Sequence, residues 1–185
     1  MDRRILKTKK AIKNAYLALL EKKDYKDISV KELVDLADIN RSTFYLHYYD
    51  INQVFEELID EVFEKVSAAI PEEGIRFDEI DTVIGKMNEV IKEDHDHSLV
   101  ISRASDYPYF SKSLLTMMKE KIDTKSLTNH DLNEKEKELL MEILSYMTYS
   151  ITNYLVKNYP VSEVDTHFEV IRKHIFRPVI EDLMN

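Results

Sequence analysis

Apolar residues recur at every third or fourth position along most of the chain, which is the period of an amphipathic α-helix. This pattern predicts helices over residues 3–21, 29–37, 40–48 and 51–70, several more between 78 and 122, and two long ones over 133–157 and 162–184. Pro178 is expected to kink the last helix near its end. The 185 residues include two Gly and four Pro, too few turn-formers for a sheet of several hairpins. The sequence therefore predicts an all-α fold.

Two of the predicted helices, residues 29–37 and 40–48, are unusually short. Ser29 and Glu32 form a capping box at the start of the first, in which each side chain satisfies a free backbone N–H group. Asn40 is a cap candidate for the second. Isolated helices this short are marginal in water and persist only when they pack against neighbours. We therefore expect them to form a three-helix unit with residues 3–21.

Two short helices joined by a tight turn are the arrangement of a helix-turn-helix, whose second helix lies in the major groove of DNA. Phe44 and Tyr48 lie four residues apart and are expected to face inward. Guanidinium, hydroxyl and ring groups suit base edges and phosphates. The residues that carry such groups on the outer side are Arg41, Ser42, Tyr45 and His47. The same pattern also fits the corner of a helical bundle with these side chains on its surface.

The distribution of charge favours DNA binding by the N-terminal part. The net charge of −9 argues against a nucleic-acid partner, because phosphate binding uses Lys and Arg. However, residues 1–50 carry 11 Lys and Arg against 8 Asp and Glu, and the remaining 135 residues carry 15 against 27. A net charge of +3 on the first part and −12 on the second indicates that the two parts meet different partners.

Composition excludes several other classes of protein. The chain has no Cys, which removes disulfides, thiolate catalysis and Cys-based metal sites. No apolar stretch is long enough for a membrane span, so we expect a soluble, cytoplasmic protein. No nucleophile or acid–base constellation indicates an enzyme, and we expect neither a cofactor nor a bound metal.

The segment Glu93–His97 leaves one alternative of a different class. His95 and His97 stand among carboxylates, and such a mixture can hold zinc or another divalent ion. Residues two apart point to different faces of a helix, so we interpret the cluster as solvated. The alternative is a helical enzyme or metal-binding protein that uses these two histidines.

The run Ile28-Ser-Val-Lys-Glu-Leu-Val-Asp-Leu-Ala-Asp-Ile-Asn-Arg-Ser-Thr-Phe-Tyr-Leu-His-Tyr-Tyr-Asp50 resembles the DNA-binding motif of the TetR family. The resemblance covers roughly residues 5–65 and implies a helix-turn-helix domain joined to a helical, ligand-sensing and dimerising domain. Matching positions imply that Ser29 and Lys31 approach phosphates. The other positions that this family uses for DNA contacts hold Asn40, Arg41, Ser42, Thr43, Tyr45 and His47.

The motif departs from the family pattern at two positions. Asp38 stands in the turn where the family usually has Gly, and Asp tolerates a left-handed conformation better than most residues. Ile51 stands where the family usually has Lys, which removes one phosphate contact. Lys9, Lys10 or Arg41 are candidates to replace that contact.

These observations lead to a division into a DNA-binding domain at 1–50, packed on the start of the helix over 51–70, and an effector-binding and dimerisation domain at 51–185. We expect a homodimer through residues 133–157 and 162–184, which would place two DNA-binding units on two half-sites of a double-stranded operator. The expected function is a repressor that a small-molecule effector releases from its operator. An activator or coregulator that acts through a protein partner is the alternative. The residues predicted to line an effector pocket are Met87, Tyr107, Phe110, Met118, Tyr146 and Tyr149.

Overall fold

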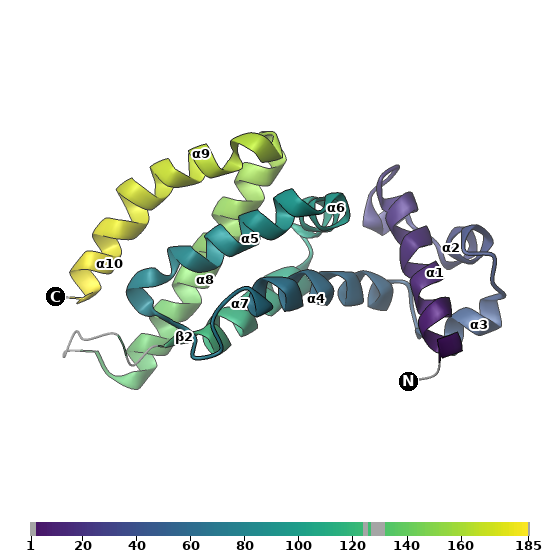
Figure 1. The fold of residues 1–185 in the computed structure, drawn as a ribbon, viewed down its shortest axis with the longest axis horizontal. Coiled ribbons are helices and arrows are strands. Elements are labelled where there is room, and N and C mark those ends of the chain that lie inside the picture. The colour runs from purple at the N-terminus through teal and green to yellow at the C-terminus, as the bar shows by residue number, and fades with distance from the viewer. Residues whose placement is uncertain (1–2, 124–125, 127–131, 185) are drawn as a thin grey trace.

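The computed structural model describes residues 3–123, 126 and 132–184, and its helices form two groups joined by one long helix (Figure 1). The first group, which we call the head, comprises α1 (Arg3–Leu20), α2 (Val30–Leu36) and α3 (Arg41–Tyr45). Helix α4 (Asn52–Ala68) leads from the head into the second group, the body. The body contains α5 (Asp81–Glu93), α6 (His95–Ala104), α7 (Pro108–Lys121), α8 (Glu134–Asn158), α9 (Val161–Ile171) and α10 (Arg177–Met184). The predicted all-α fold is confirmed.

Short strands and 3₁₀ turns lie in the connections between the α-helices. Strand β1 (Ile75–Arg76) pairs in parallel with β2 (Ile122–Asp123), with Ile75 opposite Ile122. Single 3₁₀ turns occur at Tyr25–Asp27 and Phe77–Glu79. The strand pair therefore fixes the connection between α4 and α5 against the C-terminal end of α7.

The C-terminal helix is less regular than the sequence predicts. Residues Arg172–Phe176 form a π-helical turn between α9 and α10, and Pro178 lies in the first turn of α10. Proline has no N–H group to bond to the carbonyl of residue 174, so a continuous α-helix would lose a hydrogen bond there. The helix widens into the π-helical turn immediately before Pro178, and the predicted kink near its end stays a prediction.

The head shares its hydrophobic core with the first turns of α4. Tyr16 of α1 and Phe44 of α3 are fully buried, and so are Val54 and Phe55 of α4. The rings of Tyr16 and Phe55 stack with their centroids 5.7 Å apart. Because α2 and α3 are too short to be stable alone, their conformation depends on this packing against α1 and α4.

The core of the body continues directly from that of the head along α4. Helix α7 packs between α4 and α8. The ring of Phe110 on α7 contacts Phe63 of α4 at 5.1 Å and Tyr149 of α8 at 5.9 Å, measured between centroids. No helix in the described part of the chain combines the length and apolar character of a membrane span.

Gly74 occupies a backbone conformation that a side chain would strain. Its φ angle is 79°, and a Cβ atom there would lie 2.6 Å from the carbonyl oxygen of Lys121. We predict that Gly74→Ala lowers the free energy of unfolding by about 1–3 kcal/mol, measured by urea denaturation. Gly85→Ala is the matched control, because nothing lies within 4 Å of its Cβ. It should raise the free energy of unfolding by up to about 1 kcal/mol. Equal effects of the two changes would contradict the prediction.

Candidate DNA-binding surface

The first helix of the motif begins with the predicted capping box. The Ser29 Oγ accepts a hydrogen bond from the Glu32 N–H at 3.3 Å, and the Ser29 N–H donates to Glu32 Oε2 at 3.2 Å. Lys23 Nζ lies 2.7 Å from Glu32 Oε1. Lys23, together with the hydroxyl and N–H of Ser29, lowers the pKa of Glu32 to about 2. The start of α2 is therefore stabilised by the capping box of Ser29 and Glu32 and by Lys23, which follows α1.

The turn between α2 and α3 depends on the residue that replaces the usual glycine. Asp38 has a φ angle of 52°, which is the left-handed conformation expected from the sequence. The Ile39 N–H donates to the Val34 carbonyl at 3.1 Å, as in a Schellman motif that ends a helix. This motif reverses the chain sharply enough for α3 to cross α2. The helix-turn-helix geometry is therefore present without glycine.

Helix α3 faces the core and the solvent as its sequence predicts. Phe44 and Tyr48 are buried, and their rings stack with centroids 5.7 Å apart. Asn40 is the N-cap residue, although its side chain makes no capping hydrogen bond. The remaining predicted contact residues of the motif are exposed or half-buried: Ser29, Lys31, Arg41, Ser42 and Tyr45 are exposed, and Thr43 and His47 are half-buried. The structure thus leaves each of these eight side chains at least partly accessible.

Arg41 and Tyr45 form a pair on the exposed side of α3. Arg41 Nη2 donates a hydrogen bond to the Tyr45 hydroxyl at 3.2 Å, and the guanidinium lies 5.6 Å from the ring centroid. Both groups can also bond to bases or phosphates. Leu46, which is not among the predicted contact residues, is 81% exposed at the end of the same helix. Its two-residue separation from the inward-facing Phe44 was the signal that could have identified it.

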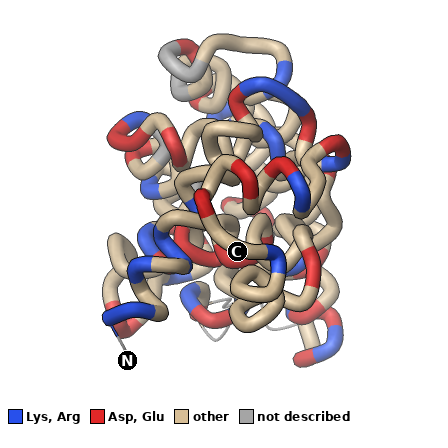
Figure 2. The backbone as a smooth tube through the Cα atoms, turned by 90° about the vertical axis from the view of Figure 1, so that its right-hand side faces the viewer, with Lys and Arg blue, Asp and Glu red and all other residues tan. Residues whose placement is uncertain are grey.

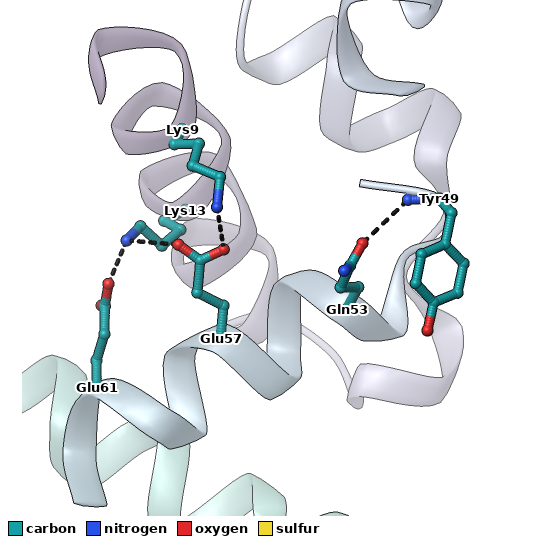
Figure 3. A network of polar contacts seen from close by, with 6 residues as sticks. All are labelled: Lys9, Lys13, Tyr49, Gln53, Glu57 and Glu61. Carbon is teal, nitrogen blue, oxygen red and sulfur yellow. Dashed lines mark hydrogen bonds and ion pairs between the residues drawn. The ribbon is translucent and has the colours of Figure 1, made fainter. Parts of the chain in front are cut away.

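Figure 3 shows the ion pairs that join α1 to α4 beside the start of α4. Lys9 Nζ lies 2.7 Å from Glu57 Oε2, and Lys13 Nζ lies 3.3 Å from Glu57 Oε1 and also bonds to Glu61. Burial by itself would lower the pKa of Lys13, but its hydrogen bonds and attraction to Glu61 and Glu57 raise that pKa overall. Lys9 therefore already has an acidic partner, which weakens it as a replacement for the missing phosphate contact at Ile51.

Ile51 itself belongs to the junction between head and body. Its side chain is half-buried at the N-cap of α4. The Gln53 N–H donates to Asp50 Oδ1 at 3.0 Å, and Gln53 Oε1 accepts a hydrogen bond from the Tyr49 N–H at 3.0 Å (Figure 3). The start of α4 is thus capped by Asp50 and Gln53. Lys10 and Arg41 are exposed and stay candidates for the phosphate contact.

The positive charge of the head is partly neutralised within the chain. Lys23 pairs with Glu32, and Lys26 Nζ lies 3.1 Å from Asp106 Oδ2 of the body. In Figure 2, positions of Lys and Arg lie among positions of Asp and Glu along the backbone. Acidic side chains from the rest of the chain, Glu57, Glu61 and Asp106, therefore offset part of the positive charge of residues 1–50.

The two histidines of the metal alternative contact different carboxylates. His95 Nε2 lies 3.2 Å from Glu21 Oε1 on the head, and His97 Nδ1 lies 3.6 Å from Asp94 Oδ2. Among the residues that the structure describes, no group of three or more His, Asp or Glu side chains is arranged to hold a metal ion. His95 and Asp94 take part instead in contacts that position the N-terminus of α6, where Asp94 accepts a hydrogen bond from the Asp96 N–H.

The six residues predicted to line an effector pocket occupy different environments. Met87, Phe110 and Met118 are buried in the core. Tyr107 and Tyr149 are half-buried, and Tyr146 is exposed on α8. Two open clefts lie elsewhere: one of about 680 Å³ between α4 and α7, and one of about 610 Å³ between α1, α4 and α6. Other side chains line these two clefts, so the predicted pocket stays a prediction.

Fold and motif together define an all-α protein with an N-terminal helix-turn-helix. No protein-family model matches the sequence. The chain is 35% identical over 60 residues to YxbF, an uncharacterized HTH-type transcriptional regulator of Bacillus subtilis (strain 168). That match covers 32% of this chain and 16% of the length of the relative.

The fold is similar to that of a solved TetR family regulator. The crystal structure of the TetR family repressor AlkX from Dietzia sp. strain DQ12-45-1b matches 96% of this chain and 97% of its own chain, with a TM-score of 0.50 and 13% sequence identity. The resemblance to the TetR family that residues 28–50 indicate is therefore confirmed at the level of the fold.

The capping box predicts how the head responds to acid. Since the pKa of Glu32 is about 2 in the folded chain and about 4.3 in an unfolded one, its contribution is complete above about pH 4.3 and is lost as the pH falls toward 2. We expect Glu32→Gln to remove this dependence from the free energy of unfolding, measured by urea denaturation from neutral to acid pH. Asp35→Asn is the control, because it removes the same charge from the exposed side of α2. This variant should retain the pH dependence of the free energy of unfolding. A difference between wild type and Glu32→Gln that stays constant over this range would contradict the prediction.

Proposed function

We propose that this protein is a sequence-specific, DNA-binding transcription regulator of the TetR type and not an enzyme. The observation that carries the proposal is the exposed side of α3, where a guanidinium, hydroxyls and rings stand on a helix whose other side is anchored in the head. In a helix-turn-helix this side enters the major groove. A regulator of this kind acts where the DNA is, so we expect it in the cytoplasm.

A homodimer is part of the proposal, because one head covers one half-site. An exposed apolar stripe on α8 supports it, since its members lie within about one quarter of the helix circumference. The stripe consists of Leu139, Ile143, Tyr146 and Tyr154. Val170, Ile175 and Val179 are exposed on the segment from α9 to α10. Two copies of these helices would bury both sets of side chains in an intermolecular four-helix bundle.

Repression with release by a small molecule is the mode of action that we propose for the dimer. Helix α4 supports this mode because it extends from the head core to the lining of both open clefts. Both clefts are of the size that small-molecule ligands occupy. A ligand that favours one position of α4 would change the spacing of the two heads and thereby the fit to two half-sites.

The proposed function predicts a particular pattern of DNA binding. We expect the protein to bind the DNA upstream of its own gene more tightly than a scrambled duplex, measured by fluorescence anisotropy at several salt concentrations. Affinity should fall steeply as salt rises, because phosphate contacts release counterions. Arg41→Ala and Tyr45→Ala should each lower operator affinity by about 1–3 kcal/mol and leave the oligomeric state unchanged.

Lys119→Ala is the matched control for Arg41→Ala. It removes one positive charge from an exposed position on α7 of the body, so operator affinity should stay close to that of wild type. Binding without sequence preference or salt dependence would contradict the proposed function. Normal operator binding by the Arg41 and Tyr45 variants would contradict the assignment of the α3 surface.

The proposed dimer predicts the effect of a charge on the α8 stripe. Ile143→Glu would place two unpaired carboxylates in the interface, so we expect dimerisation to weaken by about 2 kcal/mol or more. Light scattering after size-exclusion chromatography measures the change from dimer to monomer. Thr116→Glu adds the same charge at an exposed position on α7 and should leave the dimer intact. A dimer that withstands the change at Ile143 would rule out this interface.

A further inference from the structure

Leu46 combines an apolar side chain with an unusually exposed position. It is 81% exposed, more than any other large apolar residue in the described parts of the chain. Single exposed leucines are common on protein surfaces, so exposure alone does not assign a role. The direction of this side chain and the groups around it decide what it can bind.

The backbone of α3 points Leu46 directly away from the head core. Phe44 is fully buried, and side chains two positions apart on a helix differ in direction by about 200°. Leu46 retains helical φ and ψ angles of −76° and −19°, and its N–H donates to the Thr43 carbonyl at 3.3 Å. Ser42, four residues earlier, is exposed on the same side. Ser42 and Leu46 therefore lie on the outward side of α3, which we call the reading face, with Leu46 at its C-terminal end.

Polar groups flank Leu46 on the reading face. The Arg41 guanidinium bonds to the Tyr45 hydroxyl along one edge of the helix, and Ser42 adds a further hydroxyl. Leu46 itself has no group that donates or accepts a hydrogen bond. Within the major groove the 5-methyl group of thymine is the apolar feature of a base edge. On a base edge in the major groove, the thymine methyl group is therefore the partner that suits the apolar side chain of Leu46.

We propose that Leu46 determines specificity for thymine, by packing against the 5-methyl group of one thymine in each half-site. The inference rests on the proposed function, since it requires α3 to lie in the major groove. Double-stranded DNA is the occupant favoured by the charge distribution, because the part of the chain that carries Leu46 has a net charge of +3 and the rest has −12. Leu46 would thus contribute base discrimination, whereas neighbouring cations contribute affinity for phosphates.

Uracil in place of thymine tests the proposal, because it removes only the methyl group. Wild-type protein first selects a preferred duplex from a pool of random sequences, and each thymine of that duplex is then replaced by uracil in turn. At one thymine per half-site, we expect the replacement by uracil to lower the affinity of the wild-type protein about fourfold. This factor corresponds to the loss of one buried methyl group. At that position Leu46→Ala should bind the thymine and uracil duplexes equally.

Leu36→Ala is the matched control, since it truncates another exposed leucine of the head, at the end of α2. It should discriminate between thymine and uracil as the wild type does. Because Leu46 is exposed, Leu46→Ala should also keep the wild-type circular dichroism and melting temperature.

Two results would overturn the inference and leave the proposed function intact. In one, wild-type protein binds a preferred duplex with salt dependence and tolerates every uracil. In the other, Leu46→Ala retains the full preference for thymine. If the wild type selects no preferred sequence and shows no salt dependence, the proposed function and the role of Leu46 fail together.

Discussion

The head depends on one interaction, the packing of its helices around Phe55 at the start of α4. The Phe55 ring is fully buried, with the rings of Tyr16, Tyr25 and Tyr107 at centroid distances of 5.7, 5.1 and 5.5 Å. Aromatic pairs of this kind add stability beyond the area that they bury. Helices as short as α2 and α3 have little stability of their own, so this shared core determines whether the reading face exists.

The same cluster connects the head to the body. Tyr25 belongs to the head, whereas Tyr107 precedes α7 and donates a hydrogen bond to Glu56 of α4 at 2.9 Å. Burial and this bond to Glu56 raise the pKa of Tyr107. One residue earlier, Asp106 pairs with Lys26 of the head. The loop between α6 and α7 therefore contacts both the head and α4.

Further contacts extend from this loop to the proposed dimer helix. The Tyr149 hydroxyl on α8 donates to the Ser105 carbonyl, and the Tyr149 ring contacts Phe110 on α7. On the other side of the head, the ion pairs of Lys9 and Lys13 with Glu57 and Glu61 fasten α1 to α4 (Figure 3). A change in the position of α4 would consequently displace the head as well, which is what the proposed release from DNA requires.

Local sequence signals predicted the parts of the site that depend on neighbouring residues. The capping box of Ser29 and Glu32 and the left-handed Asp38 involve groups within a few residues of each other, and both occur in the structure. Periodicity likewise assigned Phe44 to the core. It did not single out Leu46, because an apolar residue in a helical pattern is first interpreted as part of a core.

Local sequence signals could not predict contacts between segments that are distant in the sequence. Lys9 is one of several similar lysines in the sequence, and only the folded chain brings Glu57 to it from 48 residues away. The predicted pocket residues share a chemical character, yet packing buries Met87 and exposes Tyr146.

By itself the sequence determined the helical class of the fold, the capping box of α2 and the inward and outward sides of α3, because these follow from interactions over three or four residues. Only the tertiary structure decided which lysines carry acidic partners, where the open clefts lie and how far Leu46 is exposed. These features depend on how the helices pack, and the same helical periods are compatible with many packings.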